Sequence, residues 1–256
     1  MDYKFKFVIY AITVAIMTCI IYKCIPNEVA KPIPNLKKHH ETNGPDDGSL
    51  NMFANMSAVV AFAITGVFAI YTPNIDLFGA IVLGVITAIG GGTIRDAIMD
   101  VPIFWIKTPM YVWLPAIASI ITFYSASMLS QSQLYEFILY MDGFGSAMFG
   151  IQGARKAWKH TPNNCTFAII MGVISAIGGG LIRDILAGNK TLLMSHDLYA
   201  VPVLFGCALY VFLLKYSSKL INDNAITIVS TAFIFLFRAA SIKWHLTVPN
   251  MFIGHL

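Results

Sequence analysis

The sequence predicts an all-α, multi-pass membrane protein. Its predicted core has seven helices, in two inverted three-helix repeats plus a seventh helix, and one extra N-terminal transmembrane helix precedes it. Three observations support this: the composition, a series of apolar runs of membrane-spanning length, and a long internal repeat. Of 256 residues, 57% are hydrophobic and 12% are charged, and the mean hydropathy is +0.70. A soluble protein carries about 25% charged residues. The composition therefore argues against a soluble enzyme and places the chain in a lipid bilayer.

Charge and cysteine usage exclude several other classes. The formal net charge of +4 is small and scattered, so no nucleic-acid partner is expected. The four cysteines lack metal-ligand spacing and lie in or beside apolar runs, where cysteine behaves as a small hydrophobe. No Walker loop or catalytic Ser-His-Asp or Cys-His pattern is present. We expect no metal, no cofactor and no enzymatic activity.

The first apolar run extends from Phe7 to Tyr22 and has lysines on both sides. A polar stretch from Asn27 to Asn51 follows, lacks apolar periodicity and is typical of a flexible linker. A basic start before an apolar run also occurs in cleaved secretory signals. No small-residue cleavage site follows the run, so a retained anchor helix is the preferred interpretation and a removed signal the alternative.

Seven further runs have the length of about 17–25 residues that a helix needs to cross a bilayer. They are Phe53–Tyr71, Leu77–Met99, Tyr111–Leu129, Leu134–Gly153, Thr166–Ala187, Leu198–Leu214 and Ala225–Ile242. The predicted organisation is an anchor and linker over residues 1–50, three-helix repeats over 51–131 and 132–217, and a seventh core helix with a tail over 218–256.

An internal repeat relates Ile81–Asp96 to Ile169–Asp184, with twelve of sixteen positions identical at a constant offset of 88. The preceding spans align with one residue slipped, which places Phe62 on Phe149. Each repeat contains three spans, and an odd number places the two copies in opposite orientations across the membrane. Inverted repeats with broken helices are typical of transporters and some channels.

Each repeat carries a glycine triplet inside its middle span. The triplets are Gly90, Gly91 and Gly92, and Gly178, Gly179 and Gly180. Glycine costs about 1 kcal/mol relative to alanine inside an aqueous helix. A break or kink at each triplet would expose backbone to a cavity, and we favour this interpretation. The alternative is close helix packing through small residues.

An Arg-Asp pair follows each triplet, at Arg95-Asp96 and Arg183-Asp184. Ionisable groups in the bilayer need a partner or water. Sequence neighbours point about 100° apart on a helix, so we expect crossed or next-turn pairing, the crossed option being Arg95 with Asp184 and Asp96 with Arg183. The alternative is that both pairs only mark the membrane interface. Asp142 in the fourth span is a further candidate, facing the pathway or lying at a helix end.

The doubled Gly-Gly-Gly-x-x-Arg-Asp motif, Val101–Lys107 and the closing Arg238–His245 segment resemble the bacterial membrane family described by its glycine-transporter domain. That family is related in architecture to the trimeric intracellular cation (TRIC) channels. The likeness extends from about Met52 to Pro249. Two features depart from it: Asn55 stands where the family has an acid matching Asp142, and the first span lies outside the family core.

The resemblance implies a homotrimer in the bacterial inner membrane, with a pathway through each protomer. It implies glycine or a similar small amino acid as substrate, bound at both triplets and both Arg-Asp pairs. Arg95 or Arg183 would bind the carboxylate, and Asp96, Asp184 or Asp142 the ammonium. The alternative is a TRIC-like monovalent cation channel that conducts potassium. Positive charges in the loops and at the amino end give opposite answers for membrane orientation, which stays open.

Overall fold

The computed structural model describes residues 49–70, 76–125, 131–194, 198–217 and 222–246. The anchor predicted at Phe7–Tyr22 and its linker lie outside these described residues. Within them, every regular element is helical.

Seven long helices correspond to the seven predicted core spans. They are α2 (Ser49–Ala69), α3 (Leu77–Ile98), α5 (Met110–Ser125), α6 (Gln131–His160), α7 (Cys165–Leu186), α8 (Ala200–Ser217) and α9 (Asp223–Lys243). By length and composition, α3, α7 and α9 can each cross a membrane, and α2, α5 and α8 contain shorter apolar stretches. The all-α, seven-helix core is confirmed.

Three local features differ from the prediction. Helix α6 continues to His160, beyond the predicted end at Gly153. The hydropathy pattern assigns its last two turns to a loop because they carry basic residues. Two short elements were not predicted at all. They are α4 (Phe104–Lys107) and the 3₁₀ helix η2 (Leu192–Met194), which follow α3 and α7 respectively.

The repeat is visible in the helix boundaries themselves. Asp76 caps α3 by accepting from the Gly79 amide, and Asn164 caps α7 by accepting from the Phe167 amide. Side-chain oxygens at this position satisfy amides that have no partner inside the helix. Both ends of α7 lie 88 residues after those of α3, so the offset of the motif holds over the whole helix.

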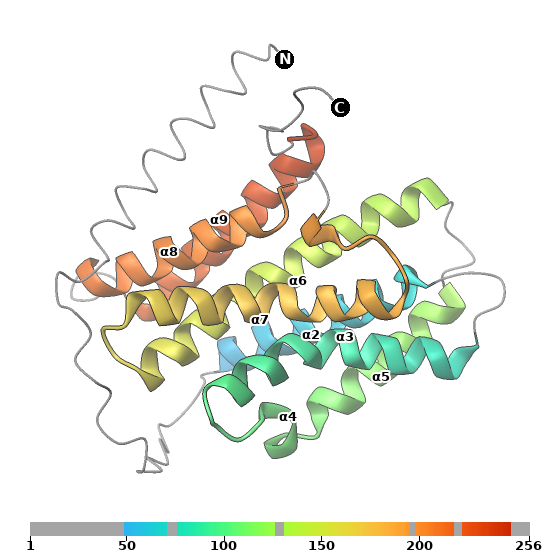
Figure 1. Ribbon diagram of the computed structural model, residues 1–256, viewed down its shortest axis with the longest axis horizontal. Helices are drawn as coiled ribbons and strands as arrows, with labels where there is room; N and C mark the ends of the chain where they lie inside the picture. Colours follow the sequence, from blue (N-terminus) through green and yellow to red (C-terminus); the bar gives the residue numbers. More distant parts are fainter. Residues whose placement is uncertain (1–48, 71–75, 126–130, 195–197, 218–221, 247–256) are drawn as a thin grey trace, which may run out of the picture.

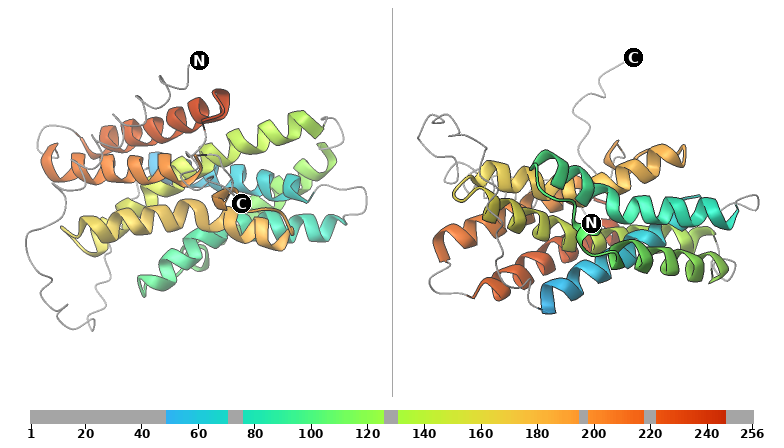
Figure 2. Two further views of the ribbon diagram at one scale, coloured as in Figure 1. Left: turned by 45° about the horizontal axis from the view of Figure 1, so that its top comes forward. Right: turned by 90° about the horizontal axis from the view of Figure 1, so that it is seen from below.

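Helix packing follows the same internal symmetry. Helix α3 packs on α7 and α2 packs on α6, while α5 covers α2 and α3 as α8 covers α6 and α7. Figure 1 shows α3 and α7 side by side and running in opposite directions. Helix α9 packs on α6 and α8 without a counterpart in the first repeat, and lies at the outside of the bundle (Figure 2).

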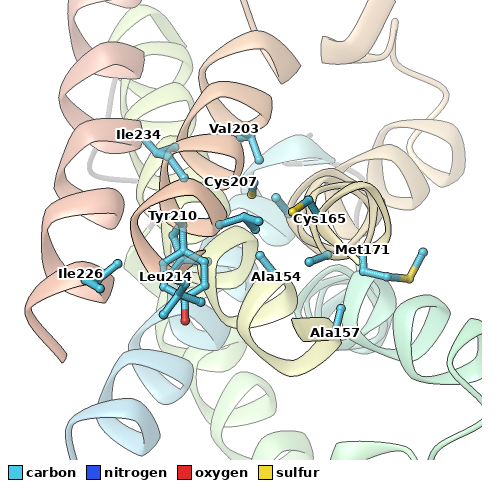
Figure 3. Close-up of a cluster of buried hydrophobic side chains, with 14 of the residues drawn as sticks. Ala154, Ala157, Cys165, Met171, Val203, Cys207, Tyr210, Leu214, Ile226 and Ile234 are labelled. Atoms are coloured by element: carbon cyan, nitrogen blue, oxygen red, sulfur yellow. The ribbon is translucent and has the colours of Figure 1, made fainter. Parts of the chain in front are cut away.

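Three apolar clusters lie between these helices, and the two larger ones hold most of the bundle together. The larger cluster joins α6, α7, α8 and α9. Figure 3 shows Val203 and Cys207 of α8 among the side chains of this cluster, with Ile234 of α9 close by. The smaller joins α2, α3 and α6 and contains the rings of Phe62 and Phe149, 5.7 Å apart. These two phenylalanines are the pair that the repeat alignment places at equivalent positions.

Large apolar side chains also cover the outer faces. Trp113 and Ile117 on α5 and Leu236 on α9 are more than half exposed. A patch of this kind would be unstable in water, but lipid tails solvate it. The outer faces therefore fit a bilayer environment.

Candidate functional site

Both glycine triplets lie within unbroken helices, so the expected break is wrong. Helix α3 runs continuously through Gly90–Gly92 and α7 through Gly178–Gly180. The glycines serve close packing instead. A Cβ on Gly91 would clash with the Ser175 carbonyl oxygen, and one on Gly179 with that of Thr87. The missing side chains let two antiparallel backbones touch.

The contacts at this crossing follow the pseudo-two-fold axis. Thr87 and Ser175 occupy equivalent positions, and so do Gly91 and Gly179, and each pair exchanges contacts across the crossing. Every triplet residue is buried. The axis that relates the repeats therefore passes between the two triplets.

The third glycine of each triplet has a different neighbour, an aromatic ring. A Cβ on Gly92 would clash with one atom of the Phe104 ring and lie 3.2 Å from two others. A Cβ on Gly180 would lie 2.7 Å from the Tyr199 hydroxyl. Phe104 also lies 5.9 Å below the Arg95 guanidinium. The third glycine of each triplet therefore leaves room for one aromatic side chain beside the Arg-Asp pair that follows.

The expected crossed pairing of the Arg-Asp motifs is also wrong. Arg95 Nε donates to Asp96 Oδ1 at 2.8 Å, and Arg183 Nε donates to Asp184 Oδ1 at 2.8 Å. The 100° separation applies where the side chains leave the helix, but the long arginine stem reaches back to its neighbour. All four side chains are buried.

Each aspartate also holds the short helix that follows it. Asp96 Oδ2 accepts from the Phe104 amide at 3.0 Å, and Asp184 Oδ2 accepts from the Leu192 amide at 2.9 Å. These amides begin α4 and η2, eight residues after the aspartate in both repeats. The two carboxylates therefore tie equivalent segments to the ends of α3 and α7.

Arg95, Asp96 and Lys156 form the Arg95 cluster. Lys156 Nζ lies 2.7 Å from Asp96 Oδ1, and its side chain is 36% exposed. Arg95 Nη1 donates to the Ser175 hydroxyl at 3.1 Å, which joins the first repeat to the second. Two cations therefore share one carboxylate.

Arg183, Asp184 and Asp142 form the Arg183 cluster. Asp142 Oδ1 accepts from Arg183 Nη1 at 2.7 Å, and both side chains are almost fully buried. Asp142 thus occupies the interior and not a helix end. Here two carboxylates share one cation, the reverse of the Arg95 cluster.

One helix supplies the third charge to both clusters. Asp142 and Lys156 lie on α6, fourteen positions apart, and at about 1.5 Å per residue this separates them by about 21 Å along the helix axis. The hydrocarbon core of a bilayer is about 30 Å thick. Helices α3 and α7 run antiparallel (Figure 1). Because Arg95 and Arg183 lie in the last turns of these helices, the clusters lie towards opposite ends of the bundle.

A third arginine lies beside the Arg183 cluster. Arg238 of α9 is only 1% exposed, and its guanidinium stacks 4.9 Å from the centre of the Tyr199 ring. Its Nη1 donates to the Leu198 carbonyl oxygen at 2.8 Å. The sequence signals Arg238 as a charge inside a span, but nothing in the pattern assigns Tyr199, Lys156 or Phe104 to the site.

A seven-helix bundle with pseudo-two-fold symmetry and buried charge clusters towards its two ends defines a membrane transport protein, a transporter or a channel. The family comparison agrees. The glycine transporter family matches in two copies, at residues 52–127 and 139–215. The chain belongs to this family.

Two relatives illustrate the membership. The chain is 34% identical over 196 residues to the UPF0126 inner membrane protein YadS of Escherichia coli strain K12, covering 74% of this chain and 90% of that one. It is 34% identical over 206 residues to a UPF0126 membrane protein of Vibrio cholerae, covering 80% and 84%. With its apolar helices, the chain is a multi-pass bacterial inner-membrane protein.

Solved structures give the same fold. The trimeric intracellular cation channel orthologue of Rhodobacter sphaeroides is 30% identical with a TM-score of 0.72, and the match covers 78% of this chain and all of that one. A trimeric intracellular cation channel of Caenorhabditis elegans shares the fold at 13% identity and a TM-score of 0.54, covering 77% and 92%. The expected relation to TRIC architecture is confirmed.

Proposed function

We propose that the protein is a carrier of a small amino acid, with glycine as the leading substrate, and that it works by alternating access. The observation that carries the proposal is the presence of buried charges of both signs in the Arg95 cluster and in the Arg183 cluster. Arg95 and Lys156 pair with Asp96, and Arg183 pairs with Asp142 and Asp184. Arg238 lies over the Tyr199 ring beside the Arg183 cluster. An amino acid presents both an ammonium and a carboxylate, and a cluster that holds charges of both signs suits both ends.

The charge balance favours a zwitterion over a bare cation. Four buried or half-buried basic side chains outnumber the three carboxylates, and a permeating cation would be repelled by that excess. A zwitterion brings no net charge, so its transfer needs no change in the balance. The domain name of the family points in the same direction.

The two Asp-held segments supply the gates in this proposal. Asp96 closes α4 on one end of the bundle and Asp184 closes η2 on the other. Release of one aspartate from its amide would open one end while the opposite cluster stays closed. Alternating opening of this kind is the expected behaviour of inverted repeats. We further propose a homotrimer, by analogy with the trimeric channels that share the fold.

A TRIC-like potassium channel is the second candidate. The 30% identity to the Rhodobacter sphaeroides cation channel favours it. In that case Asp96, Asp142 and Asp184 would line a pore and attract the ion.

Transport by the purified full chain in sealed liposomes separates the two candidates. Labelled glycine uptake is measured together with potassium current on the same preparation. The carrier proposal expects saturable uptake that unlabelled glycine displaces, without unitary currents. Potassium currents without glycine uptake would overturn it and establish the channel.

A further inference from the structure

Arg238 is a buried cation without a carboxylate partner among the described residues. Its Nη1 is used by the Leu198 carbonyl oxygen, but Nε and Nη2 have no hydrogen-bond partner in the described part of the chain. Burial of an uncompensated charge costs several kcal/mol. Arg95 and Arg183, by contrast, already hold their own aspartates. Arg238 is therefore the arginine of this region best able to accept an added anion.

Asp142 is a buried carboxylate of the same region and carries the opposite charge to Arg238. Its Oδ1 accepts from Arg183, whereas Oδ2 is buried and has no hydrogen-bond partner within 3.5 Å among the residues the structure describes, the Tyr199 hydroxyl being the neighbouring donor that interacts with this carboxylate. The residue has no exposed surface. A buried carboxylate oxygen without a donor is costly, and an ammonium group would satisfy it.

Three contacts bring these two groups together. The Arg238 stem crosses α6 at Gly143, the residue after Asp142, where a Cβ would lie 2.8 Å from Arg238 Cγ. The guanidinium then lies over the Tyr199 ring. A Cβ on Gly180 would lie 2.7 Å from the Tyr199 hydroxyl and 3.3 Å from Asp142 Oδ1, so that hydroxyl is close to the Asp142 carboxylate. Tyr199 therefore lies between the free donors of Arg238 and the free acceptor of Asp142.

We propose that Arg238 and Asp142 are the two ends of the amino-acid site, with Tyr199 as the residue that occludes it. Arg238 Nε and Nη2 donate to the substrate carboxylate, and Asp142 Oδ2 accepts from the substrate ammonium. In the conformation described here, Tyr199 separates the two, and it moves aside when the substrate enters. The site thus uses the seventh helix, α9, which stands outside the two repeats. This inference rests on the proposed amino-acid transport.

The test compares glycine with two analogues that each lack one charged end. Glycinamide keeps the ammonium and has no carboxylate, and acetate keeps the carboxylate and has no ammonium. Full-length protein in sealed liposomes is assayed for labelled glycine uptake with each analogue as competitor. Glycine binding to the detergent-purified protein is measured calorimetrically as a readout independent of transport.

For the wild type, we expect competition by glycine at least tenfold stronger than by either analogue. Arg238→Gln should raise the KM for glycine at least tenfold and remove the advantage of glycine over glycinamide. Asp142→Asn should remove its advantage over acetate. Lys243→Gln, an exposed position on the same helix, is the matched control and should leave KM unchanged.

Arg238→Lys covers the case in which Arg238→Gln fails to fold. It keeps the charge but loses the two-donor geometry, so KM should rise by less while the selectivity over glycinamide falls. Glycine uptake by the wild type with unchanged KM and selectivity in the folded Arg238 variants would overturn the site and leave the transport proposal standing. A wild type that neither binds nor transports glycine would overturn both.

Discussion

Asp96 and Asp184 are equivalent residues that make the same two contacts. Each carboxylate accepts from the arginine before it and from the backbone amide eight residues after it. They differ in the third charge of their clusters. A lysine, Lys156, pairs with Asp96 itself, whereas an aspartate, Asp142, pairs with Arg183, the arginine that precedes Asp184.

Loss of charge at Asp96 should destabilise the protein more than the same loss at Asp184. Asp96→Asn leaves Arg95 and Lys156 without a carboxylate, and removing one partner of a buried pair costs about 3–5 kcal/mol. Asp184→Asn leaves Arg183 with Asp142, so the cost should fall to about 1–3 kcal/mol. Thermal unfolding in detergent measures the order. Equal loss of Tm in the two variants would contradict the cluster assignment.

Both substitutions should also reduce transport. Asparagine has one side-chain oxygen, so it cannot serve the arginine and the short-helix amide as the carboxylate does. We expect glycine uptake per correctly folded protein to fall at least tenfold in Asp96→Asn and in Asp184→Asn. Size-exclusion elution of each variant controls for folding. Uptake at the wild-type level in both would exclude a gating role for these residues.

Arg95 and Lys156 share one carboxylate oxygen but should contribute unequally to stability. Lys156 is 36% exposed, and a pair that water reaches is worth about 0–1 kcal/mol. The Arg95 side chain is 5% exposed and also binds Ser175. Lys156→Met should therefore lower Tm slightly and Arg95→Met strongly. A larger effect at Lys156 would show that the pair is more buried in the membrane than in the isolated chain.

Within one triplet, two glycines should respond differently to alanine. A Cβ on Gly91 meets backbone of α7, which cannot move without separating the helices, so Gly91→Ala should cost about 1–3 kcal/mol or more. A Cβ on Gly90 lies 2.9 Å from Ile182 Cδ1, the flexible end of a side chain. Gly90→Ala is the matched control and should retain a Tm close to that of wild type. Similar behaviour of the two variants would argue against backbone contact at Gly91.

The sequence predicts the helices well because apolar length is a local property. The seven core spans follow from it, whereas the 88-residue repeat follows from sequence identity and the inverted arrangement from the odd number of spans in each repeat. Helix α6 shows where this signal stops. Its last turns carry Arg155, Lys156 and Lys159, and a hydropathy pattern cannot distinguish a helix leaving the bilayer from a loop.

The pairing within the candidate site needed the three-dimensional structure. Spacing identifies Arg95, Asp96, Arg183 and Asp184 as charges inside spans, but the reach of a side chain depends on its rotamer and on the neighbouring helix. The triplets pose the same problem. Glycine weakens a helix in isolation, yet at Gly91 and Gly179 the gain from backbone packing outweighs that local cost.

Helix α6 has a mechanical consequence. Because Asp142 and Lys156 stand on one uninterrupted helix, an axial displacement of α6 acts on the Asp142–Arg183 pair and on the Lys156–Asp96 pair together. Helix α6 therefore couples the Arg95 cluster mechanically to the Arg183 cluster. A change in the ion pairs of one cluster can thus reach the other cluster through α6, without any change in the triplet crossing between them.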